Sequence, residues 1–396
     1  MSALEVLLGA VRVGLLEQFE DEEYLFSFDS AWLRLPARPV LGQLFEDRRP
    51  HDIPTSGLPC WFAHLLPQGP LRRAIARQYG LEDYDDFELL EVLGEELPGA
   101  VVIRRTDSPL PRRVSRPPPP EPLTAGALRF SLAGAQWKLS VREGERGLTI
   151  PVRGQTGSWI AKFHDPSHAH LPRVEQATMS WARACGLNVP TVRQGHASEF
   201  EQLPEGIPTG DGTVFLIERF DRGPEGQRIH MEDMAQVLDR PPGPQQYAGR
   251  YEHIATVLAN LAPADLREFC ERLVFCILSG NTDAHLKNWA LLYPDGRHPR
   301  LSPVYDFVAS MLYVPPLDDE LALTLGDSRR FEAIRLDSFS LMAQSTGHSF
   351  AELSTWVQQA VERVRTVWSE KASELLFLPA ERQRLDQHMA RIPLCT

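Results

Sequence analysis

Apolar and polar positions follow two different periods in the first hundred residues, and each period predicts a kind of element. The stretch YLFSFDSAWLRL (24–35) alternates with a period of two, which favours β-strands. In WFAHLLPQGPLRRAIARQYG (61–80) and DDFELLEVLG (85–94), apolar residues recur at helical spacing. Strands followed by helices in a segment of this size predict a small α+β module.

A proline-rich stretch then separates this module from the larger remainder of the chain. TDSPLPRRVSRPPPPEPLT (106–124) holds seven prolines and no core-like pattern, which predicts an extended linker. Beyond it, strand patterns are followed by largely helical sequence from about residue 231 to the end, and this order predicts a two-lobed α+β body. The predicted strands lie at 126–132, 136–142, 158–163 and 213–219.

One polar cluster interrupts the apolar pattern of the second half. LREFCERLVFCILSG (266–280) has a helical pattern that ends at Gly280, and WALLY (289–293) has the apolar character of a buried strand. Between them stand Asp283, His285, Lys287 and Asn288. A plain turn needs about two such polar residues, so four of them indicate a site.

Composition and charge narrow the class of protein. The 396 residues are 43% hydrophobic and 24% charged, as in an ordinary globular protein of two or three domains, and they contain no apolar run of membrane-spanning length. Five cysteines without paired spacing argue against a disulfide framework or a zinc site and favour a reducing, intracellular location. A net charge of −12 disfavours autonomous binding to nucleic acid or membranes.

Four further stretches carry candidate chemistry, and each also has an ordinary structural explanation. Small residues in LRFSLAGAQWKLSV (128–141) would let backbone N–H groups approach phosphate oxygens, although most hairpin glycines only form turns. Lys162 and Asp306 stand in apolar surroundings, where a charge needs a partner, although a strand lysine is usually solvated at an edge. Glu175 lies near a helix start, where a carboxylate is favourable in any case.

Spacing and order favour a common chemical explanation. Asp283 and Asn288 are five residues apart, the interval between Asp and Asn in the kinase catalytic loop. Phosphoryl transfer requires a phosphate-covering loop, a strand lysine with a helix glutamate, a catalytic Asp, an Asn ligand and a second metal-binding Asp. All occur here in that order, which predicts a kinase that uses ATP and Mg²⁺.

The ordered motifs resemble those of the HipA-type serine/threonine kinase toxins of bacterial toxin–antitoxin systems. The motifs that carry the resemblance are SLAGAQWKL, IAKF, IERFDR, RIHMEDMAQVL, GNTDAHLKN and SPVYDFVAS, and similarity to the family's N-terminal subdomain extends over 61–103. The resemblance implies a protein-kinase-like two-lobed α+β fold with a small N-terminal α+β subdomain and an all-helical C-terminal lobe. The expected divisions are a HipA-type N-terminal subdomain (1–105), the linker (106–124), the kinase N-lobe (125–230) and the helical C-lobe (231–396).

The resemblance also implies roles for individual residues. Asp283 is similar to the catalytic base, Asn288 and Asp306 to the Mg²⁺ ligands, and Lys162 with Glu175 to the pair that contacts the ATP phosphates. The remaining nucleotide-site positions are the phosphate-binding loop Ala133, Gly134, Ala135, Gln136, Trp137 and Lys138, the hinge Glu218, Arg219 and Phe220, the ribose neighbour Asp221, and His285, Lys287 and Tyr305. Trp137 stands where the family more often has a polar residue or proline.

Regulation and partners follow from the resemblance alone. The position of Ser131 is autophosphorylated in the family, and a phosphate there would repel ATP phosphates and inactivate the kinase. The implied partners are a helix-turn-helix antitoxin, through which the chain would contact DNA only indirectly, and an aminoacyl-tRNA synthetase as protein substrate, in the bacterial cytoplasm and without membrane contact. Two alternatives remain open. One is a lipid kinase, because the D-x-H-x-x-N pattern also resembles the catalytic loop of phosphoinositide kinases. The other is a non-catalytic pseudokinase that acts as a regulator together with the antitoxin.

Overall fold

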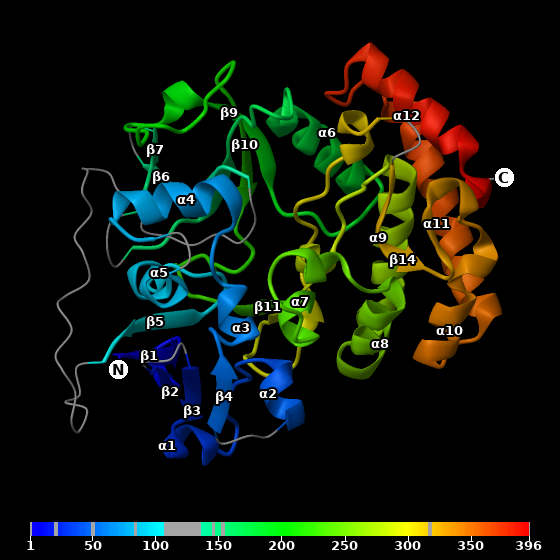
Figure 1. Ribbon diagram of the computed structural model, residues 1–396. Helices are drawn as coiled ribbons and strands as arrows, with labels where there is room; N and C mark the ends of the chain where they lie inside the picture. The colour runs from blue at the N-terminus through cyan, green and yellow to red at the C-terminus, as the bar shows by residue number, and fades with distance from the viewer. Residues whose placement is uncertain are drawn as a thin grey trace.

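A computed structural model (Figure 1) describes residues 2–19, 23–48, 52–82, 85–106, 136–144, 147–151, 155–315 and 319–395. The predicted strand 126–132 lies outside these ranges, as do Ser131, Ala133, Gly134 and Ala135 and nearly all of the proline-rich linker. Within the described ranges, none of the helices combines the length and hydrophobicity that crossing a bilayer requires.

The N-terminal segment forms an antiparallel sheet of order β4-β3-β2-β1-β5. Its strands are β1 (Ser2–Leu8), β2 (Val11–Gln18), β3 (Glu23–Phe28), β4 (Asp52–Ser56) and β5 (Val101–Arg105). The predicted strand 24–35 is correct only as far as Phe28. Asp29 then accepts a hydrogen bond from the Ala31 backbone N–H at 2.7 Å and so caps the short helix α1 (Ser30–Leu33), because an aspartate at this position favours a helix start over a continued strand.

Four further helices are described in this segment, and one of them lies beside the next sheet. They are α2 (Gln43–Arg48), α3 (Cys60–Ala63), α4 (Gly69–Gln78) and α5 (Asp86–Leu93). α5 packs on β5, while α4 lies beside the second sheet in Figure 1. Leu71 and Ile75 of α4 are fully buried and share one apolar cluster with Leu139 and Ala161 of that sheet. The N-terminal segment and the sheet after the linker therefore share a core.

The second sheet has the order β7-β6-β8-β10-β9, and all of its pairings are antiparallel. Its strands are β6 (Lys138–Gly144), β7 (Gly147–Thr149), β8 (Trp159–Lys162), β9 (Val192–His196) and β10 (Thr213–Glu218), and helix α6 (Leu171–Ala184) packs on it. In β10 the side chains alternate between two cores: Val214 and Leu216 join the N-terminal cluster, whereas Phe215 joins the C-terminal one. The strand is thus apolar on both faces because each face is covered.

The C-terminal lobe is mainly helical, but it is not all-helical as expected, because five of its described segments pair as strands. Its helices are α7 (Met234–Val237), α8 (Tyr251–Leu261), α9 (Leu266–Ser279), α10 (Ser340–Thr346), α11 (Phe350–Lys371) and α12 (Pro379–Arg391). Two small antiparallel sheets accompany them, made of β11 (His230–Asp233), β12 (Ala290–Tyr293) and β13 (Arg300–Leu301), and of β14 (Glu320–Leu325) and β15 (Ser328–Arg330). β12 confirms the buried strand expected after the polar cluster.

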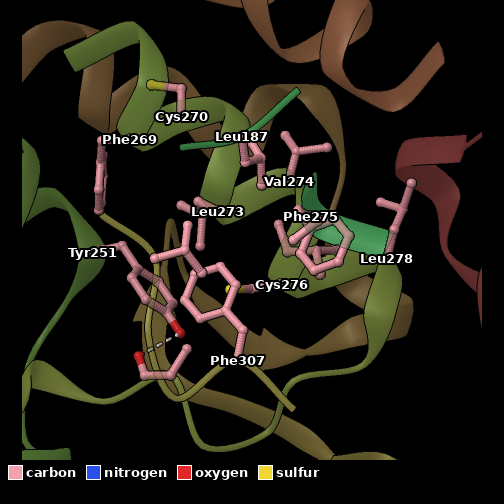
Figure 2. Packing of buried hydrophobic residues seen from close by; sticks show 14 of the residues in the cluster. Leu187, Tyr251, Phe269, Cys270, Leu273, Val274, Phe275, Cys276, Leu278 and Phe307 are labelled. Atoms are coloured by element: carbon pink, nitrogen blue, oxygen red, sulfur yellow. Dashed lines mark hydrogen bonds between the residues drawn. The ribbon is translucent and has the colours of Figure 1, made fainter. Parts of the chain in front are cut away.

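α9 lies at the centre of this lobe and explains where the polar cluster stands. Its residues from Leu273 to Ser279 are all buried, and Figure 2 shows Phe269, Val274, Phe275 and Leu278 pointing from it in different directions into the surrounding core. This second half of α9 carries no charged residue, and it is buried on every side. It ends at Gly280, where φ is +65° and an added Cβ would stand 2.4 Å from the Met311 side chain.

Candidate active site

Three charged side chains from distant parts of the chain meet at the centre of the site. Lys162 ends β8, Glu175 lies in the first turns of α6, and Asp306 follows β13. The Lys162 ammonium donates hydrogen bonds to Glu175 Oε1 and to Asp306 Oδ1. Lys162 is 3% exposed and Glu175 is fully buried, so the lysine is paired and not the solvated edge residue that its strand position also allowed.

A second lysine stands opposite the first. Lys138 of β6 is the direct cross-strand partner of Lys162, so both side chains point from the same face of the sheet, and Lys138 is also buried. Two like charges facing each other are unfavourable unless anions compensate for them. Glu175 and Asp306 supply two carboxylates that compensate for the two ammonium groups, and ammonium groups are donors that suit phosphate oxygens.

Burial and pairing shift the pKa values of all four groups. Burial lowers the pKa of Lys138 to about 8, against the attraction of Asp306. Burial also acts to lower the pKa of Lys162, but Asp306 and Glu175 outweigh it and hold that pKa above its usual range. Burial raises the pKa of Glu175 to about 7, whereas Lys162 and Lys138 overcome the effect of burial on Asp306 and hold its pKa well below its usual range.

The loop after α9 fixes its backbone through its own side chains. The Asn281 side-chain oxygen accepts a hydrogen bond from the Asp283 N–H at 2.9 Å. The Asn288 side-chain N–H₂ donates to the Asp283 carbonyl oxygen at 2.8 Å, and the His285 N–H donates to the same oxygen at 2.7 Å. These bonds hold the loop while the Asp283 residue stays exposed and Ala284, like the residues that follow it, is buried. The Asp283 carboxylate is therefore presented to solvent on a fixed backbone.

The segment that carries Asp306 is tied to this loop. The Tyr305 hydroxyl donates to the Lys287 carbonyl oxygen at 2.6 Å, and Asp306 adopts a left-handed backbone with φ of +55°. This conformation is uncommon for a residue other than glycine and tolerated by aspartate. Contacts thus run without a break from Lys162 through Asp306 and the Tyr305–Lys287 bond to the Asn288–Asp283 loop.

Asp306 and Asn288 provide the donor atoms that Mg²⁺ prefers. The Asn288 side-chain N–H₂ donates to the Asp283 carbonyl oxygen, so the side-chain oxygen of Asn288 can bind a metal ion. Asp306 has a second carboxylate oxygen beside the one that accepts from Lys162. Mg²⁺ is usually held by one or two such protein oxygens together with water and phosphate oxygens. The chemistry of this pair fits a magnesium ion bound together with a nucleotide.

Lys287 lies at the loop but points away from a phosphate site. Its ammonium donates to Asp233 Oδ2 at 2.9 Å and to the Nδ1 and the carbonyl oxygen of His64, each at 3.0 Å. His64 Nε2 lies 2.6 Å from the Arg240 carbonyl oxygen, which can only accept, so Nε2 carries the proton and Nδ1 is free to accept from Lys287. All three donors of Lys287 are used, so it orders the loop against the N-terminal segment.

The RIHMEDMAQVL motif has a structural role that its sequence did not reveal. Asp233 caps α7 through a reciprocal pair of hydrogen bonds with Gln236 and also pairs with Lys287. The buried Glu232 carboxylate accepts from the Tyr293 hydroxyl at 2.5 Å, the Gln43 N–H at 3.0 Å and Trp61 Nε1 at 3.2 Å. The motif joins the N-terminal segment to the strand that follows the polar loop.

The hinge residues divide between the site and a buried charge cluster. Glu218 is exposed, and the Phe220 ring lies 5.5 Å from that of Tyr305, on the side of the site. Arg219 instead donates to both oxygens of Asp221, at 2.9 and 2.7 Å, and to Glu96 at 2.8 Å. Because the side chains of Arg219 and Asp221 already bond to each other and to Glu96, only the backbone of these two residues is available for the predicted nucleotide contacts.

Of the other predicted positions, the described part of the phosphate loop and His285 lie beside this centre. Gln136 and Trp137 are partly buried, and the Trp137 carbonyl accepts from the Phe163 N–H at 2.9 Å next to Lys162. His285 is 8% exposed, and its Nδ1 accepts from the Lys287 N–H at 3.1 Å, which makes the ring neutral with the proton on Nε2. Burial lowers its pKa, in agreement with that form.

Comparison with known proteins identifies the class to which this fold and site belong: the chain is a member of the HipA-like family. The HipA-like C-terminal domain matches residues 130–368, and the HipA N-terminal domain matches residues 4–104. The expected resemblance is thereby confirmed, together with the two-lobed kinase-like α+β fold.

Relatives in two bacteria support this assignment. The chain is 34% identical over 410 aligned positions to a putative kinase, Y4dM, of Sinorhizobium fredii, with 100% of this chain and 98% of that protein covered. It is 24% identical to the serine/threonine-protein kinase toxin HipA of Shewanella oneidensis over 72% of this chain and 70% of that protein. The solved complex of Shewanella HipA, HipB and operator DNA has the same fold, with a TM-score of 0.72, 21% identity and coverage of 98% of this chain and 96% of that one.

Proposed function

We propose that this protein is a Mg-ATP-dependent serine/threonine protein kinase. The observation that carries the proposal is the contact of Lys162 with both Glu175 and Asp306, in continuous connection with the loop that presents Asp283. Phosphoryl transfer relies on positioning and electrostatic stabilisation, and these groups are of the kinds that it requires. Relatives named as kinases support the same reading.

Each residue has a distinct part in the proposed reaction. Asp283 accepts the proton of a substrate hydroxyl, because its carboxylate is exposed on a backbone fixed by Asn281 and Asn288. Lys162 and Lys138 hold phosphate oxygens. Asn288 and Asp306 would hold Mg²⁺, which neutralises charge on the phosphate oxygens when it is bound. The Phe220 ring and the hinge backbone would contact the adenine base.

The biological role is part of the proposal. Shewanella HipA is a serine/threonine-protein kinase toxin, and its solved complex contains HipB and operator DNA. We infer a toxin role for this chain, with a helix-turn-helix antitoxin as partner, DNA contact through that antitoxin and an aminoacyl-tRNA synthetase as the protein substrate, in the bacterial cytoplasm. Autophosphorylation of Ser131 would inactivate the kinase by placing a phosphate group in the phosphate-binding loop.

The test compares the chain with an Asp283→Asn variant. Both are treated with phosphatase, incubated with Mg-ATP and measured by intact mass and phosphosite mapping. The wild type should gain one phosphate at Ser131, whereas Asp283→Asn should lose transfer by about three orders of magnitude, because the amide cannot accept the proton. Asp337→Asn, at an exposed position, is the matched control and should behave as the wild type. Full transfer by Asp283→Asn would contradict the role of Asp283, and ATP binding without transfer by the wild type would favour a pseudokinase.

A further inference from the structure

Tyr247, which lies in none of the sequence motifs, contacts the exposed carboxylate of Asp283. The Tyr247 hydroxyl lies 2.9 Å from Asp283 Oδ1, and it must be the donor because an ionised carboxylate only accepts. The ring of Tyr247 stands edge-on to His285, with centroids 4.6 Å apart at 82°. Tyr247 therefore contacts both Asp283 and His285 of the loop, while 37% of its own surface remains exposed.

The bond made by Tyr247 is the one that a phosphoacceptor would have to make. A serine or threonine substrate gives its hydroxyl proton to Asp283, so its oxygen must lie within hydrogen-bond distance of that carboxylate. The Tyr247 phenol already occupies such a place with the same kind of donor. Burial together with Asp283 raises the pKa of Tyr247, so the phenol stays protonated and able to donate.

The loop does not need Tyr247 for its orientation, because other hydrogen bonds already fix its backbone. Asn281, Asn288 and the His285 N–H hold the backbone on both sides of Asp283. Tyr247 itself ends a four-residue 3₁₀ helix (Pro244–Tyr247) that follows Gly243, where φ is +92° and nothing would meet an added Cβ within 4 Å. A short segment joined through an open glycine is suited to move away when a substrate arrives.

We propose that Tyr247 is a gate on the acceptor side of the site: its hydroxyl fills the place of the substrate hydroxyl on Asp283, and a protein substrate must displace it. The inference rests on the proposed kinase function. While Tyr247 is in place, its hydroxyl occupies Asp283 Oδ1, so water cannot be activated at that oxygen and hydrolysis of ATP without an acceptor is reduced. Its role is to position and select the acceptor, and it takes no part in the transfer.

The experiment compares wild type, Tyr247→Phe, Asp283→Asn and the double variant, with Tyr24→Phe as control because Tyr24 lies in the N-terminal sheet. Release of ADP is measured first without acceptor and then with a synthetic peptide of residues 126–136, GALRFSLAGAQ. Losing the competing hydroxyl should raise acceptor-free ADP release about fivefold and lower the peptide KM by about as much, with kcat within about twofold of the wild type. The double variant should be as inactive as Asp283→Asn.

A second measurement does not depend on activity. In protein labelled with ¹³C at tyrosine Cζ, the resonance that is lost in Tyr247→Phe is that of Tyr247, and it should shift in Asp283→Asn, where the bonding partner changes. A resonance that does not move would overturn the contact on which the gate depends.

The outcomes separate the gate from the kinase function. If the wild type phosphorylates the peptide and Tyr247→Phe shows a lower kcat with unchanged KM, Tyr247 orients the base and the gate is wrong. Phosphate mapped to Tyr247 itself would make this residue an acceptor and would also overturn the gate. If neither the wild type nor Tyr247→Phe releases ADP or modifies the peptide, the kinase function fails and the gate falls with it.

Discussion

Lys162 shows how one side chain can hold a site together. Its ammonium is shared by Glu175 and Asp306, and because Lys162 and Glu175 are both buried, the Glu175 carboxylate depends on the lysine and not on water for its stabilisation. Removing one member of a buried charge cluster leaves the others uncompensated, which is the costly change in such sites. The stability of the fold and the chemistry of the site therefore depend on the same residue.

The first prediction follows from this dependence. Lys162→Met should abolish phosphoryl transfer and lower the free energy of unfolding by about 3 kcal/mol at pH 8. Without the lysine, the folded-state pKa of Glu175 rises further above its unfolded value. Glu175 then binds a proton more readily in the folded state, which contributes stability at low pH that is lost as pH rises through the folded-state pKa. The loss should therefore be smaller at pH 5 than at pH 8.

Urea unfolding at the two pH values measures this difference. Lys371→Met, at an exposed position in the last turn of α11, is the control and should match the wild type at both. Equal losses for Lys162→Met at pH 5 and pH 8 would show that Glu175 does not depend on the lysine for its charge.

At the scale of elements, α12 holds two segments of the site in place: the helix α6, which carries Glu175, and the segment that follows Asp306. Arg173, two residues before Glu175 on α6, makes two hydrogen bonds to Glu381 of α12, at 2.9 and 2.7 Å. On the same helix, Arg384 donates to the carbonyl oxygens of Leu312 and Met311, at 2.6 and 2.8 Å, in the segment that follows Asp306. Figure 1 shows α12 near α6 at the edge of the molecule. The last helix thus connects the two elements that bring Glu175 and Asp306 to Lys162.

His388 anchors α12 to the central helix α9. Its Nε2 lies 2.8 Å from the Ile277 carbonyl oxygen, its ring meets the edge of Phe331, and Asp319, Glu332 and Arg391 are the charged groups around it. Burial lowers the pKa of His388 to about 4, although the Ile277 carbonyl opposes this shift. A histidine with a depressed pKa in the folded state stabilises the fold above its unfolded pKa, and this stabilisation is lost as pH falls.

The second prediction is a pH dependence located in this helix. Between an unfolded pKa near 6.5 and a folded pKa of about 4, His388 should account for a loss of about 2 kcal/mol when pH falls from 7.5 to 5. His388→Gln should show a correspondingly smaller loss over that interval, measured by denaturant unfolding at each pH. His298→Gln, at an exposed turn, should keep the acid sensitivity of the wild type. If both variants lose stability equally on acidification, His388 is not the sensitive group.

At the scale of the whole molecule, the N-terminal segment is built into the kinase-like body. It shares an apolar cluster with the second sheet, supplies His64 to Lys287, and supplies Glu96 to a buried charge cluster. In that cluster Glu96 accepts from Arg219 at 2.8 Å, Arg222 at 3.1 Å and Arg228 at 2.9 Å. The strand that ends at the hinge is therefore held in place by a carboxylate from before the linker.

The third prediction concerns this contact between segments. Glu96→Gln replaces a charge shared by three arginines with a neutral amide whose N–H₂ group faces one of them, so the free energy of unfolding should fall by about 3 kcal/mol. Because the two segments share a core, unfolding should remain a single transition when followed both by tryptophan fluorescence and by circular dichroism. Glu362→Gln on the exposed face of α11 is the control. Two separate transitions would show that the N-terminal segment unfolds on its own.

Sequence alone determined the features that depend on neighbouring residues. The five-residue interval from Asp283 to Asn288 is set within one loop, so the closing hydrogen bond between them is local and the pattern marks it. The end of α9 at Gly280 and the strand β12 follow from helical and apolar periodicity for the same reason. The end of β3 was missed, because the apolar alternation continues past Asp29 while the capping bond of that residue starts a helix.

Only the tertiary structure decided which distant groups meet. Lys162 with Asp306, Glu96 with Arg219 and Lys287 with His64 are each more than a hundred residues apart, and no periodicity relates such pairs. The sequence marked Lys287 and Asp221 as site residues, but packing gave them partners elsewhere. Tyr247 carried no motif at all, since its significance comes entirely from the 2.9 Å contact with Asp283 that the fold creates. The role of a charged group or hydroxyl depends on the group that it contacts, and the tertiary fold determines which groups are in contact.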